Sequence, residues 1–419
     1  MDQLIIEGGV CLRGTVPING AKNAALPLMA AALLAPGEHR FKNVPHLRDV
    51  VTMQKLLGHL GATSTLENHE LCIQTDNLKS HEAPYELVKT MRASVLVLGP
   101  LLARWGKAKV SLPGGCAIGA RPIDLHLKAL EQMGAVITIH DGFVEATAKK
   151  LQGAHITFDK VTVTGTENIL MAAVLADGTT ILENAAREPE IPDLARCLTA
   201  MGADITGAGT DRIVIHGGAP LRAAKHKVTA DRIEAATFLM AGAITAGAVT
   251  IEGCPAEYLA VALDKLKEAG CEIGVEGERI TLKGPKKLKP LNLTTAPYPG
   301  LATDLQAQFM ALMTLADGTS IIHETIFENR FQHALELKRL GADIALEGHT
   351  AIVKGVGALS GAPLMATDLR ASASLVLAGL AARGTTVIDR AYHIDRGYEK
   401  IEQRLQTLGA KISRKNPVS

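Results

Sequence analysis

The sequence has few aromatic residues and almost no net charge. Phe, Trp and Tyr make up 3% of the 419 residues, so the cores must be built from aliphatic side chains. The formal net charge is +1, because 44 Lys and Arg face 43 Asp and Glu. Proteins that bind nucleic acids or membrane surfaces usually carry a basic excess. The charge balance therefore gives no support for either kind of partner.

Cysteine pairs with the spacing of a zinc site or a CxxC redox motif are absent, although the chain has six scattered cysteines. With no secretory context, reduced thiols in the cytosol are the simpler interpretation. The longest apolar run, residues 24–35, is too short to span a bilayer. It also follows Asp2 and Glu7 and lacks the basic start of a signal peptide. We expect a soluble, cytoplasmic protein with no metal or other cofactor.

Several catalytic motifs are also missing. The sequence has no P-loop, no GxGxxG after a strand, no HExxH and no GxSxG. Their absence argues against a nucleotide hydrolase, a dinucleotide oxidoreductase, a zinc protease and a serine hydrolase.

What the sequence does contain is internal repetition. A helical run that ends in Gly and leads into a strand recurs about every 70 residues, at Gly61, Gly134, Gly202, Gly270, Gly341 and Gly409. A second such glycine precedes each of these, at Gly37, Gly106, Gly178, Gly247, Gly318 and Gly384. Each glycine is predicted to cap a helix in the left-handed conformation. The length favours two domains, so six α/β units give three per domain.

The sixth unit is incomplete, because the chain ends soon after Gly409. Residues 3–18 have the pattern of the stretch that begins at Arg212, so they are predicted to supply the missing strands. This predicts an N-terminal domain over 21–230 that carries the Cys116 loop. The C-terminal domain then comprises 1–20 with 231–419. A cleft between two doubly connected domains is a natural ligand site.

The most informative stretch for chemistry is SLPGGCAIGARPIDL, residues 111–125. Cys116 lies in a glycine-rich loop close to Arg121, as expected for a reactive thiol with a lowered pKa. The alternative is an ordinary small residue in a turn. The other five cysteines are interpreted as structural.

Lys22 and Asn23 lie in NGAKNAALP at a predicted helix start. A lysine there faces the positive end of the helix dipole, which a bound anion would offset. A solvated lysine is the alternative.

Charged residues open several later units: Arg92, Asp304, Arg330, Asp368, Arg370 and Arg396. The aspartates could be helix N-caps. The clustered Lys and Arg residues otherwise indicate a small polyanionic ligand.

These motifs resemble one known family along essentially the whole chain. NGAKNAALP, LPGGCAIGARPIDLHL, ENAAREPEI, TDLQAQF, FENRFQH, ATDLRASASLVLAGL and HIDRGYE are similar to the motif set of the UDP-N-acetylglucosamine enolpyruvyl transferases. The resemblance implies an α/β fold of two similar inside-out α/β barrel domains, each with three repeated units. It also implies the first committed step of peptidoglycan synthesis, with UDP-N-acetylglucosamine and phosphoenolpyruvate as substrates.

The resemblance also implies site residues. Those implied as catalytic are Lys22, Cys116, Asp304 and Arg396. Those implied in substrate binding are Lys22, Asn23, Arg92, Arg121, Pro122, Ile123, Asp124, Leu125, Lys160, Val161, Thr162, Val163, Asp304, Ile326, Arg330 and Arg370. One departure follows KVTV, where this chain reads Thr164-Gly165-Thr166 and relatives often read Gly-Ala-Thr.

In the family, the sugar 3′-hydroxyl adds to C2 of phosphoenolpyruvate while C3 is protonated, and phosphate then leaves. Asp304 is the implied base and Cys116 the implied acid. Lys22, Arg121 and Arg396 would neutralise the substrate's charge. Two alternatives are the shikimate-pathway enolpyruvyl transferase and a non-catalytic UDP-sugar-binding regulator on the same scaffold.

Overall fold

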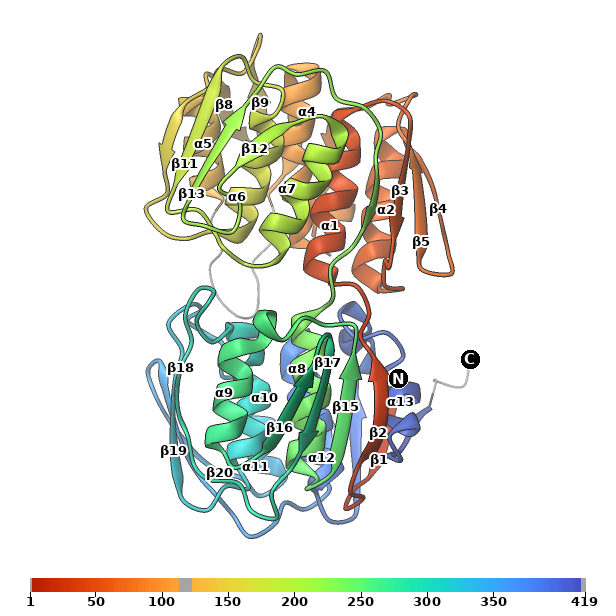
Figure 1. The fold of residues 1–419 in the computed structure, drawn as a ribbon, viewed down its shortest axis with the longest axis vertical. Helices are drawn as coiled ribbons and strands as arrows, with labels where there is room; N and C mark the ends of the chain where they lie inside the picture. The colour runs from red at the N-terminus through yellow and green to blue at the C-terminus, as the bar shows by residue number, and fades with distance from the viewer. Residues whose placement is uncertain (1, 90, 113–122, 416–419) are drawn as a thin grey trace. The chain divides into compact units, whose positions relative to one another are not determined.

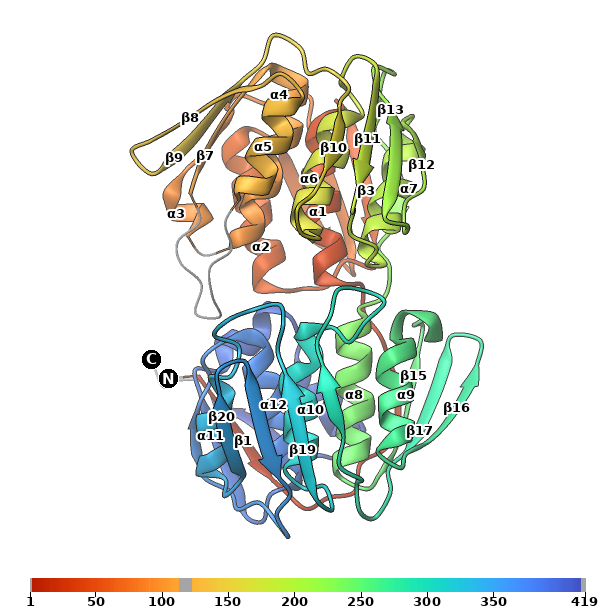
Figure 2. The same cartoon turned by 90° about the vertical axis from the view of Figure 1, so that its left-hand side faces the viewer.

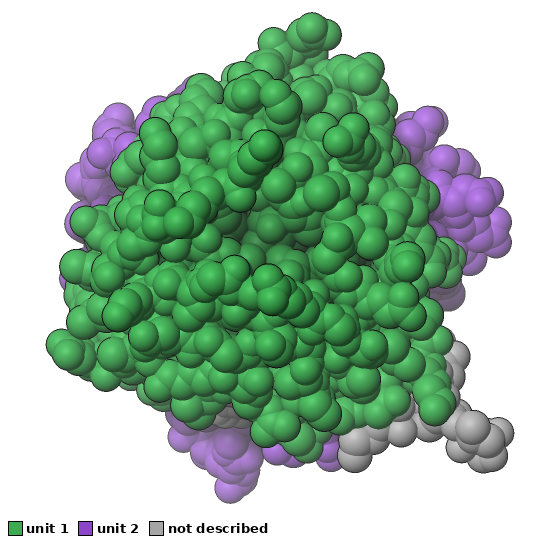
Figure 3. Space-filling view, turned by 90° about the horizontal axis from the view of Figure 1, so that it is seen from below, with its two compact units in different colours: residues 1–19, 116–120, 230–419 green, residues 20–115, 121–229 purple. Residues whose placement is uncertain are grey.

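The computed structural model describes residues 2–89, 91–112 and 123–415. The predicted loop around Cys116 therefore lies outside the described residues. The chain divides into two compact units (Figures 1 and 3). Within the described ranges, unit 1 comprises 2–19 with 230–415, and unit 2 comprises 20–89, 91–112 and 123–229.

In its described part, unit 2 contains three four-stranded sheets. Their strand orders are β14 (Lys225–Lys227), β3 (Glu38–Lys42), β5 (Glu70–Gln74), β4 (Thr63–Glu67); β6 (Glu82–Ala83), β7 (Lys107–Ser111), β9 (Phe143–Thr147), β8 (Val136–His140); and β10 (His155–Thr157), β11 (Thr179–Glu183), β13 (Arg212–His216), β12 (Asp204–Thr206). The helices are α1 (Lys22–Ala31), η1 (Ala32–Leu34), α2 (Arg48–Leu60), α3 (Tyr85–Val88), η2 (Arg92–Val97), α4 (Leu98–Trp105), α5 (Asp124–Gln132), α6 (Val163–Ala173) and α7 (Glu190–Met201).

Unit 1 repeats this plan over the residues that the structure covers. Its sheets have the orders β2 (Arg13–Pro17), β15 (Ala248–Glu252), β17 (Arg279–Lys283), β16 (Glu272–Glu276); β18 (Asn292–Thr294), β19 (Thr319–His323), β21 (Thr350–Lys354), β20 (Asp343–Glu347); and β22 (Pro363–Met365), β23 (Thr385–Asp389), β1 (Gln3–Glu7), β24 (Lys411–Lys415). Its helices are α8 (Arg232–Ile244), η3 (Ala256–Leu259), α9 (Ala260–Glu268), η4 (Thr303–Leu305), α10 (Gln306–Met313), α11 (His333–Arg339), α12 (Leu369–Ala381), η5 (Ala391–Arg396) and α13 (Ile401–Thr407).

All six sheets have the same topology, which confirms the predicted repeat of six α/β units. Each sheet joins one parallel strand pair to two antiparallel pairs. In the described chain the sheets are separate, with four strands each. A sheet whose hairpin strands alternate between buried and exposed residues covers the core from one side only and does not need to close.

The inside-out character of the fold comes from its central helices. In unit 1, α8, α10 and α12 lie side by side and are buried around almost their whole circumference (Figure 2). Their sequences are mostly apolar, as expected for helices without a solvent-facing side. The sheets lie outside them, and α1 and α6 are buried similarly in unit 2.

Both N-terminal strands lie in unit 1. β1 is an interior strand between β23 and β24, antiparallel to both, and β2 is parallel to β15. In unit 2, β14 pairs in parallel with β3. β2 and β14 are thus each the last strand of their own unit before the chain passes into the other unit. The sequence pattern predicted strands within residues 3–18, and Gln3–Glu7 and Arg13–Pro17 form them.

The repeat glycines mostly have the predicted left-handed backbone. Gly61 and Gly202, for example, cap α2 and α7 with φ of 105° and 116°. Gly247 is the exception, because Ala246 takes the positive φ instead, at 50°. A Cβ on Gly247 would lie 2.1 Å from the carbonyl oxygen of Leu12, so this glycine is needed for close backbone approach.

Candidate active site

A carboxylate and two buried guanidinium groups meet in unit 1. Asp304, in η4, accepts a hydrogen bond from Arg330 Nη2 at 2.7 Å and another from Arg370 Nε at 3.1 Å. Both arginine side chains are 5% exposed, and Asp304 is 25% exposed. Each arginine also has a buried Nη1 without a hydrogen-bond partner among the described residues. The three groups carry a net positive charge and have donors left over, so they can bind an anion.

Asp304 and Asp368 have different roles despite their similar TDL sequences. Asp368 is the N-cap of α12, and its carboxylate accepts from the backbone N–H groups of Arg370 and Ala371 at 2.8 and 3.0 Å. The N-cap alternative is therefore correct for Asp368. The cap of η4 is Ala302, and the Asp304 carboxylate bonds the two arginines.

Glu324 organises the loop beside Asp304, and the sequence reasoning missed it. Its buried carboxylate accepts from Thr295 Oγ1 at 2.8 Å, from Thr303 Oγ1 at 2.9 Å and from the N–H of Ile326 at 2.8 Å. It thus fixes both the residue before Asp304 and the predicted substrate contact Ile326. A lone glutamate within an otherwise mostly apolar stretch, IIHETIF, was the available signal.

Arg396 ends η5, and a bidentate ion pair anchors the residue before it. Arg414 donates to both carboxylate oxygens of Asp395, at 2.9 and 2.6 Å. Because Arg414 lies in β24, this pair ties the Arg396 segment to a sheet. No sequence motif pointed to Arg414.

In unit 2, Lys22 is the first residue of α1, as the sequence predicted. Its Nζ lies 3.3 Å from Asp49 Oδ2, and the two side chains are 13% and 5% exposed. The solvated-lysine alternative is therefore wrong. Asp49 is the second residue of α2 and was not identified from the sequence. Asn23 is the next residue of α1 and is half-buried.

Arg92 and Asp124 both act on a buried histidine, His126. Burial lowers the pKa of His126 to about 4, Asp124 opposes this shift, and Arg92 adds to it. Arg92 begins η2 and is half-buried, and Asp124 is the exposed first residue of α5. Both predicted sugar-nucleotide contacts thus lie close enough to His126 to affect its pKa.

The neutral His126 has a defined tautomer. Asn168 Oδ1 accepts from the N–H of Gly99 at 2.6 Å, so the amide nitrogen of Asn168 must donate to His126 Nδ1, at 3.1 Å. The ring proton then resides on Nε2, which donates to Thr164 Oγ1 at 3.3 Å. Thr164 is one of the departures from the family pattern, and here it serves as the acceptor for a buried ring.

Lys160, Val161, Thr162 and Val163 lie at the start of α6. Thr162 caps the helix by accepting from the N–H of Gly165 at 3.2 Å. A Cβ on residue 165 would lie 2.3 Å from Thr162 Cγ2, so the glycine at this departure fits the threonine cap. Lys160 is exposed, and the other three residues are half-buried.

Three predicted site residues, Cys116, Arg121 and Pro122, lie outside the described residues. Ile123, which is buried, and Leu125, which is half-buried, flank the start of α5.

The other five cysteines are free thiols, and only Cys11 is exposed. Burial raises the pKa of Cys197 and of Cys271 to about 12, and it raises the pKa of Cys254 further. These buried thiols stay protonated at neutral pH and are poor nucleophiles.

Acid should destabilise the protein through two buried histidines. Burial lowers the pKa of His126 and of His333 to about 4, from an ordinary value of 6.5. Because the folded pKa lies below the unfolded one, the unfolded state takes up protons first as the pH falls. The stability that the two neutral histidines contribute is therefore present above about pH 6.5 and is lost as the pH falls toward 4. Each histidine contributes up to about 3 kcal/mol. Urea unfolding between pH 7 and 4 should show a weaker pH dependence in His126→Gln, and an unchanged dependence would contradict this account.

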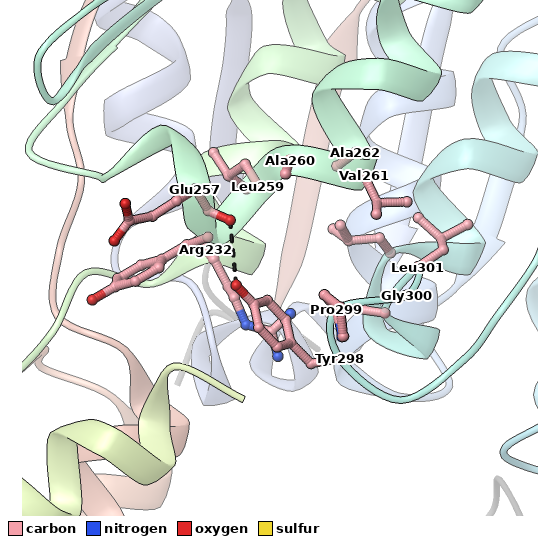
Figure 4. Close-up of a pocket in the computed structure, with 13 residues that line it drawn as sticks. Arg232, Glu257, Leu259, Ala260, Val261, Ala262, Tyr298, Pro299, Gly300 and Leu301 are labelled. Carbon is pink, nitrogen blue, oxygen red and sulfur yellow. Dashed lines mark hydrogen bonds between the residues drawn. The ribbon is translucent and has the colours of Figure 1, made fainter. Parts of the chain in front are cut away.

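A small pocket in unit 1 lies beside η4 without including the predicted site residues. Figure 4 shows Tyr298 reaching across it, with its hydroxyl donating to the carbonyl oxygen of Glu257 at 3.3 Å. The Arg232 guanidinium lies 5.7 Å from the centre of the Tyr298 ring. Leu305, the residue after Asp304, also lines the pocket.

Across the parts of the chain that the structure covers, no His, Cys, Asp and Glu side chains form a group that could hold a metal ion. In the same residues, every helix is too short or too polar to cross a membrane.

Comparison with known proteins identifies relatives along the whole chain. The profile of one family, EPSP synthase (3-phosphoshikimate 1-carboxyvinyltransferase), matches residues 6–405. A UDP-N-acetylglucosamine 1-carboxyvinyltransferase from Anaeromyxobacter sp. (strain Fw109-5) is 58% identical over 419 residues, which cover 99% of each chain. The protein of the same name from Geotalea uraniireducens (strain Rf4) is 59% identical over 414 residues, again with 99% of each covered.

Solved structures agree with these relatives. The enolpyruvyl transferase NikO from Streptomyces tendae has a TM-score of 0.88 at 28% identity, with 99% of this chain and 98% of that chain covered. An EPSP synthase from Acinetobacter baumannii has a TM-score of 0.77 at 21% identity, over 99% of this chain and 100% of that chain, which shows a shared fold.

Proposed function

The chain belongs to the EPSP synthase family and, within it, to the UDP-N-acetylglucosamine 1-carboxyvinyltransferases, and from this we infer what it does and which residues do it. It transfers the enolpyruvyl group of phosphoenolpyruvate to the 3′-hydroxyl of UDP-N-acetylglucosamine and releases phosphate. This is the first committed step of peptidoglycan synthesis. The identity of 58% over 99% of the chain is the observation that carries this conclusion.

We assign phosphoenolpyruvate binding to Lys22, Asn23, Arg121, Arg370 and Arg396. Phosphoenolpyruvate carries a phosphate and a carboxylate, which guanidinium and ammonium groups bind through charge-assisted hydrogen bonds. In support, Arg370 keeps a buried Nη1 without a partner in the described chain. Lys22 is mostly buried at a helix start, where a bound anion would offset its charge and the helix dipole.

We assign the sugar nucleotide to a second group of residues. UDP-N-acetylglucosamine carries a diphosphate, which suits the exposed Lys160 and the helix start at Thr162. Arg92, Asp124 and Ile326 are proposed to complete the contacts, together with Pro122, Ile123, Leu125, Val161, Val163 and Arg330. The Asp304 carboxylate would accept a hydrogen bond from the 3′-hydroxyl.

The proposed addition step moves two protons. Asp304 takes the proton of the 3′-hydroxyl as its oxygen adds to C2, and Cys116 supplies a proton to C3. Phosphate then leaves C2 of the tetrahedral intermediate while C3 loses a proton, which re-forms the carbon–carbon double bond of the enolpyruvyl group. In support, the Asp304 carboxylate is held in place by hydrogen bonds from Arg330 and Arg370.

Release of inorganic phosphate tests the function. The protein should release phosphate when UDP-N-acetylglucosamine and phosphoenolpyruvate are both present, and not with shikimate-3-phosphate as the acceptor. Phosphate release from phosphoenolpyruvate with shikimate-3-phosphate, but not with UDP-N-acetylglucosamine, would identify the rival enolpyruvyl transferase. Binding of the sugar nucleotide without turnover would identify the non-catalytic regulator.

Several finer properties follow from the function as proposals. An enzyme of this step acts in the cytoplasm on soluble substrates, and its loss should disturb cell shape and division. The family's cysteine is the target of the epoxide antibiotic fosfomycin, so Cys116 should make this enzyme sensitive to it.

Replacement of Cys116 should separate the acid role from other roles. Aspartate can carry a proton to C3 if the anionic substrate raises its pKa, whereas serine is a far weaker acid. We expect Cys116→Asp to keep substantial turnover and Cys116→Ser to lose about a hundredfold in single-turnover rate. Both variants should resist fosfomycin. Equal losses in the two variants, or normal single-turnover chemistry in the serine variant, would remove the acid role.

A further inference from the structure

The loop that carries the predicted substrate contact Ile326 is fastened to η4 at both of its ends. Glu324 begins this loop directly after β19, and its carboxylate accepts from Thr303 Oγ1 at 2.9 Å. Arg330 ends the loop, and its Nη2 donates to Asp304 Oδ1 at 2.7 Å. Thr303 and Asp304 are the first two residues of η4. The two contacts therefore hold both ends of the loop against the segment that contains the proposed base.

Burial distinguishes the ends of the 324–330 loop from its middle. Glu324 and Arg330 are buried, whereas the side chain of Ile326 is 36% exposed. Because the ends of the loop are fixed, a ligand that contacts Ile326 does not have to order the loop first, which lowers the cost of binding. The loop thus presents an apolar contact from a rigid support.

One oxygen of the Glu324 carboxylate determines the course of this loop. Oε1 accepts from the N–H of Ile326 and from Thr295 Oγ1, both at 2.8 Å, and from the N–H of Phe327 at 3.3 Å. Thr295 is fully buried and in turn accepts from the N–H of Thr325 at 2.9 Å. Oε1 and Thr295 together therefore satisfy three successive N–H groups of the loop, and the other carboxylate oxygen is left for η4.

The bond from Thr303 to Oε2 reaches a segment that is 21 residues away in sequence. Since Thr303 precedes Asp304, a shift of its backbone would move the Asp304 carboxylate relative to Ile326. A general base has to lie within about 2.6–3.2 Å of the group that loses the proton. Misplacement by about 1 Å can lower a rate by about 10²-fold. The spacing between Asp304 and the loop therefore matters for proton removal.

We propose that Glu324 is a positioning residue for removal of the 3′-hydroxyl proton: its two oxygens keep the Asp304 carboxylate at a fixed distance from the loop that contacts the sugar nucleotide. This rests on the proposed function. Glu324 is buried and acts only through Thr303 and through the backbone of Ile326.

The substitution Thr303→Val tests this role, because it keeps the shape of the side chain and removes the hydroxyl that links Glu324 to η4. The bonds from Glu324 to its own loop stay in place. We expect kcat to fall about tenfold, because the base is held less well for proton removal. The Kd for UDP-N-acetylglucosamine, measured by calorimetry without phosphoenolpyruvate, should stay close to the wild-type value. A lower melting temperature with an unchanged kcat of the folded protein would show that Glu324 only stabilises the fold, and would overturn the proposal.

Two matched variants serve as controls. Thr303→Ser keeps a hydroxyl that can donate to Glu324, so it should recover most of the kcat that Thr303→Val loses. Thr250→Val removes a hydroxyl from β15, where Thr250 Oγ1 lies 2.9 Å from Thr281 Oγ1, and should leave kcat and the Kd unchanged. If the serine variant lost as much kcat as the valine variant, or if Thr250→Val lost as much, the link to Glu324 would not be the cause.

Crystal structures of the wild type and of Thr303→Val separate this role from the proposed function. The Asp304 carboxylate should shift relative to Ile326 in the variant, and its 2.7 Å contact with Arg330 should lengthen. An unmoved carboxylate would overturn the positioning role of Glu324 even in an active enzyme. Failure of the proposed function would instead appear as a wild-type protein that releases no phosphate, and the crystallographic comparison would still decide whether Glu324 positions Asp304.

Discussion

A protein that lacks residues 1–18 should be insoluble or fail to fold, although none of these residues is a predicted site residue. They provide β1, which lies between β23 and β24, and β2, which pairs with β15. Four of their apolar side chains are at most 1% exposed: Leu4, Ile6, Leu12 and Val16. Burial of a large aliphatic side chain contributes about 1.5–3 kcal/mol. Their sum is comparable to the whole stability of a typical domain, about 5–15 kcal/mol.

The deletion would also expose two strand edges in the middle of a sheet. β23 and β24 would lose their shared partner, and unpaired edges promote aggregation. The measurement is the soluble fraction and the melting temperature of the truncated chain. A soluble truncated protein that melts at the wild-type temperature would contradict the assignment of these strands to unit 1.

A circular permutant provides the matched control, because it keeps the strands and changes only their order. β24 ends at Lys415, which pairs with Gln3 at the start of β1, so a short linker can join the two as a hairpin. With residues 2–19 placed after this linker and the new N-terminus at residue 20, the protein should fold. Failure of both proteins would indicate that the connection between residues 19 and 20 matters more than the strand pairing.

Much of this fold could be predicted because the repeat is marked by glycines with a physical role. Gly61 and Gly202 adopt a positive φ that favours glycine, so their spacing indicated the repeat length. The separation of the sheets could not be predicted in this way. Closure of a barrel depends on which strand edges meet, and the local pattern of β4 or β8 contains no information on that.

Charged residues at helix starts could be identified as candidates from the sequence, whereas their contacts with residues distant in sequence could not. Lys22, Asp304 and Arg370 occur in recognisable motifs, but the pairing of Lys22 with Asp49 and of Asp304 with Arg370 is fixed only by packing. Tyr398 illustrates the same limit. It is 161 residues from Thr237, and no local pattern predicts that their hydroxyls meet.

Asp304→Asn should lower kcat by about 10²–10⁴-fold, the usual contribution of one general base. Asparagine is nearly the size of aspartate and can still accept a hydrogen bond from Arg330 or Arg370, but it cannot take a proton. The Kd for UDP-N-acetylglucosamine should therefore stay within a few-fold of the wild-type value. Turnover within threefold of the wild-type value would rule out Asp304 as the base.

Stability has to be measured beside turnover in this variant. Asp304 is the partner of two buried guanidinium groups, and loss of a buried partner can cost about 3–5 kcal/mol. Assays at a temperature where circular dichroism shows a fully folded variant exclude unfolding as the cause of the loss. A decrease in kcat that only follows the unfolded fraction would assign Asp304 a structural role.

Asp368→Asn is the matched control for this charge change, because Asp368 occupies the same TDL position in the next repeat. Its carboxylate caps α12 and bonds two backbone N–H groups, and asparagine caps a helix about as well as aspartate. This variant should retain its stability and keep kcat within about threefold of the wild-type value. If both variants lost turnover equally, the loss would follow from removal of a negative charge near a helix start, and it would not identify Asp304 as the base. If only Asp304→Asn loses turnover while the sugar nucleotide still binds, removal of the 3′-hydroxyl proton is the step that has been lost.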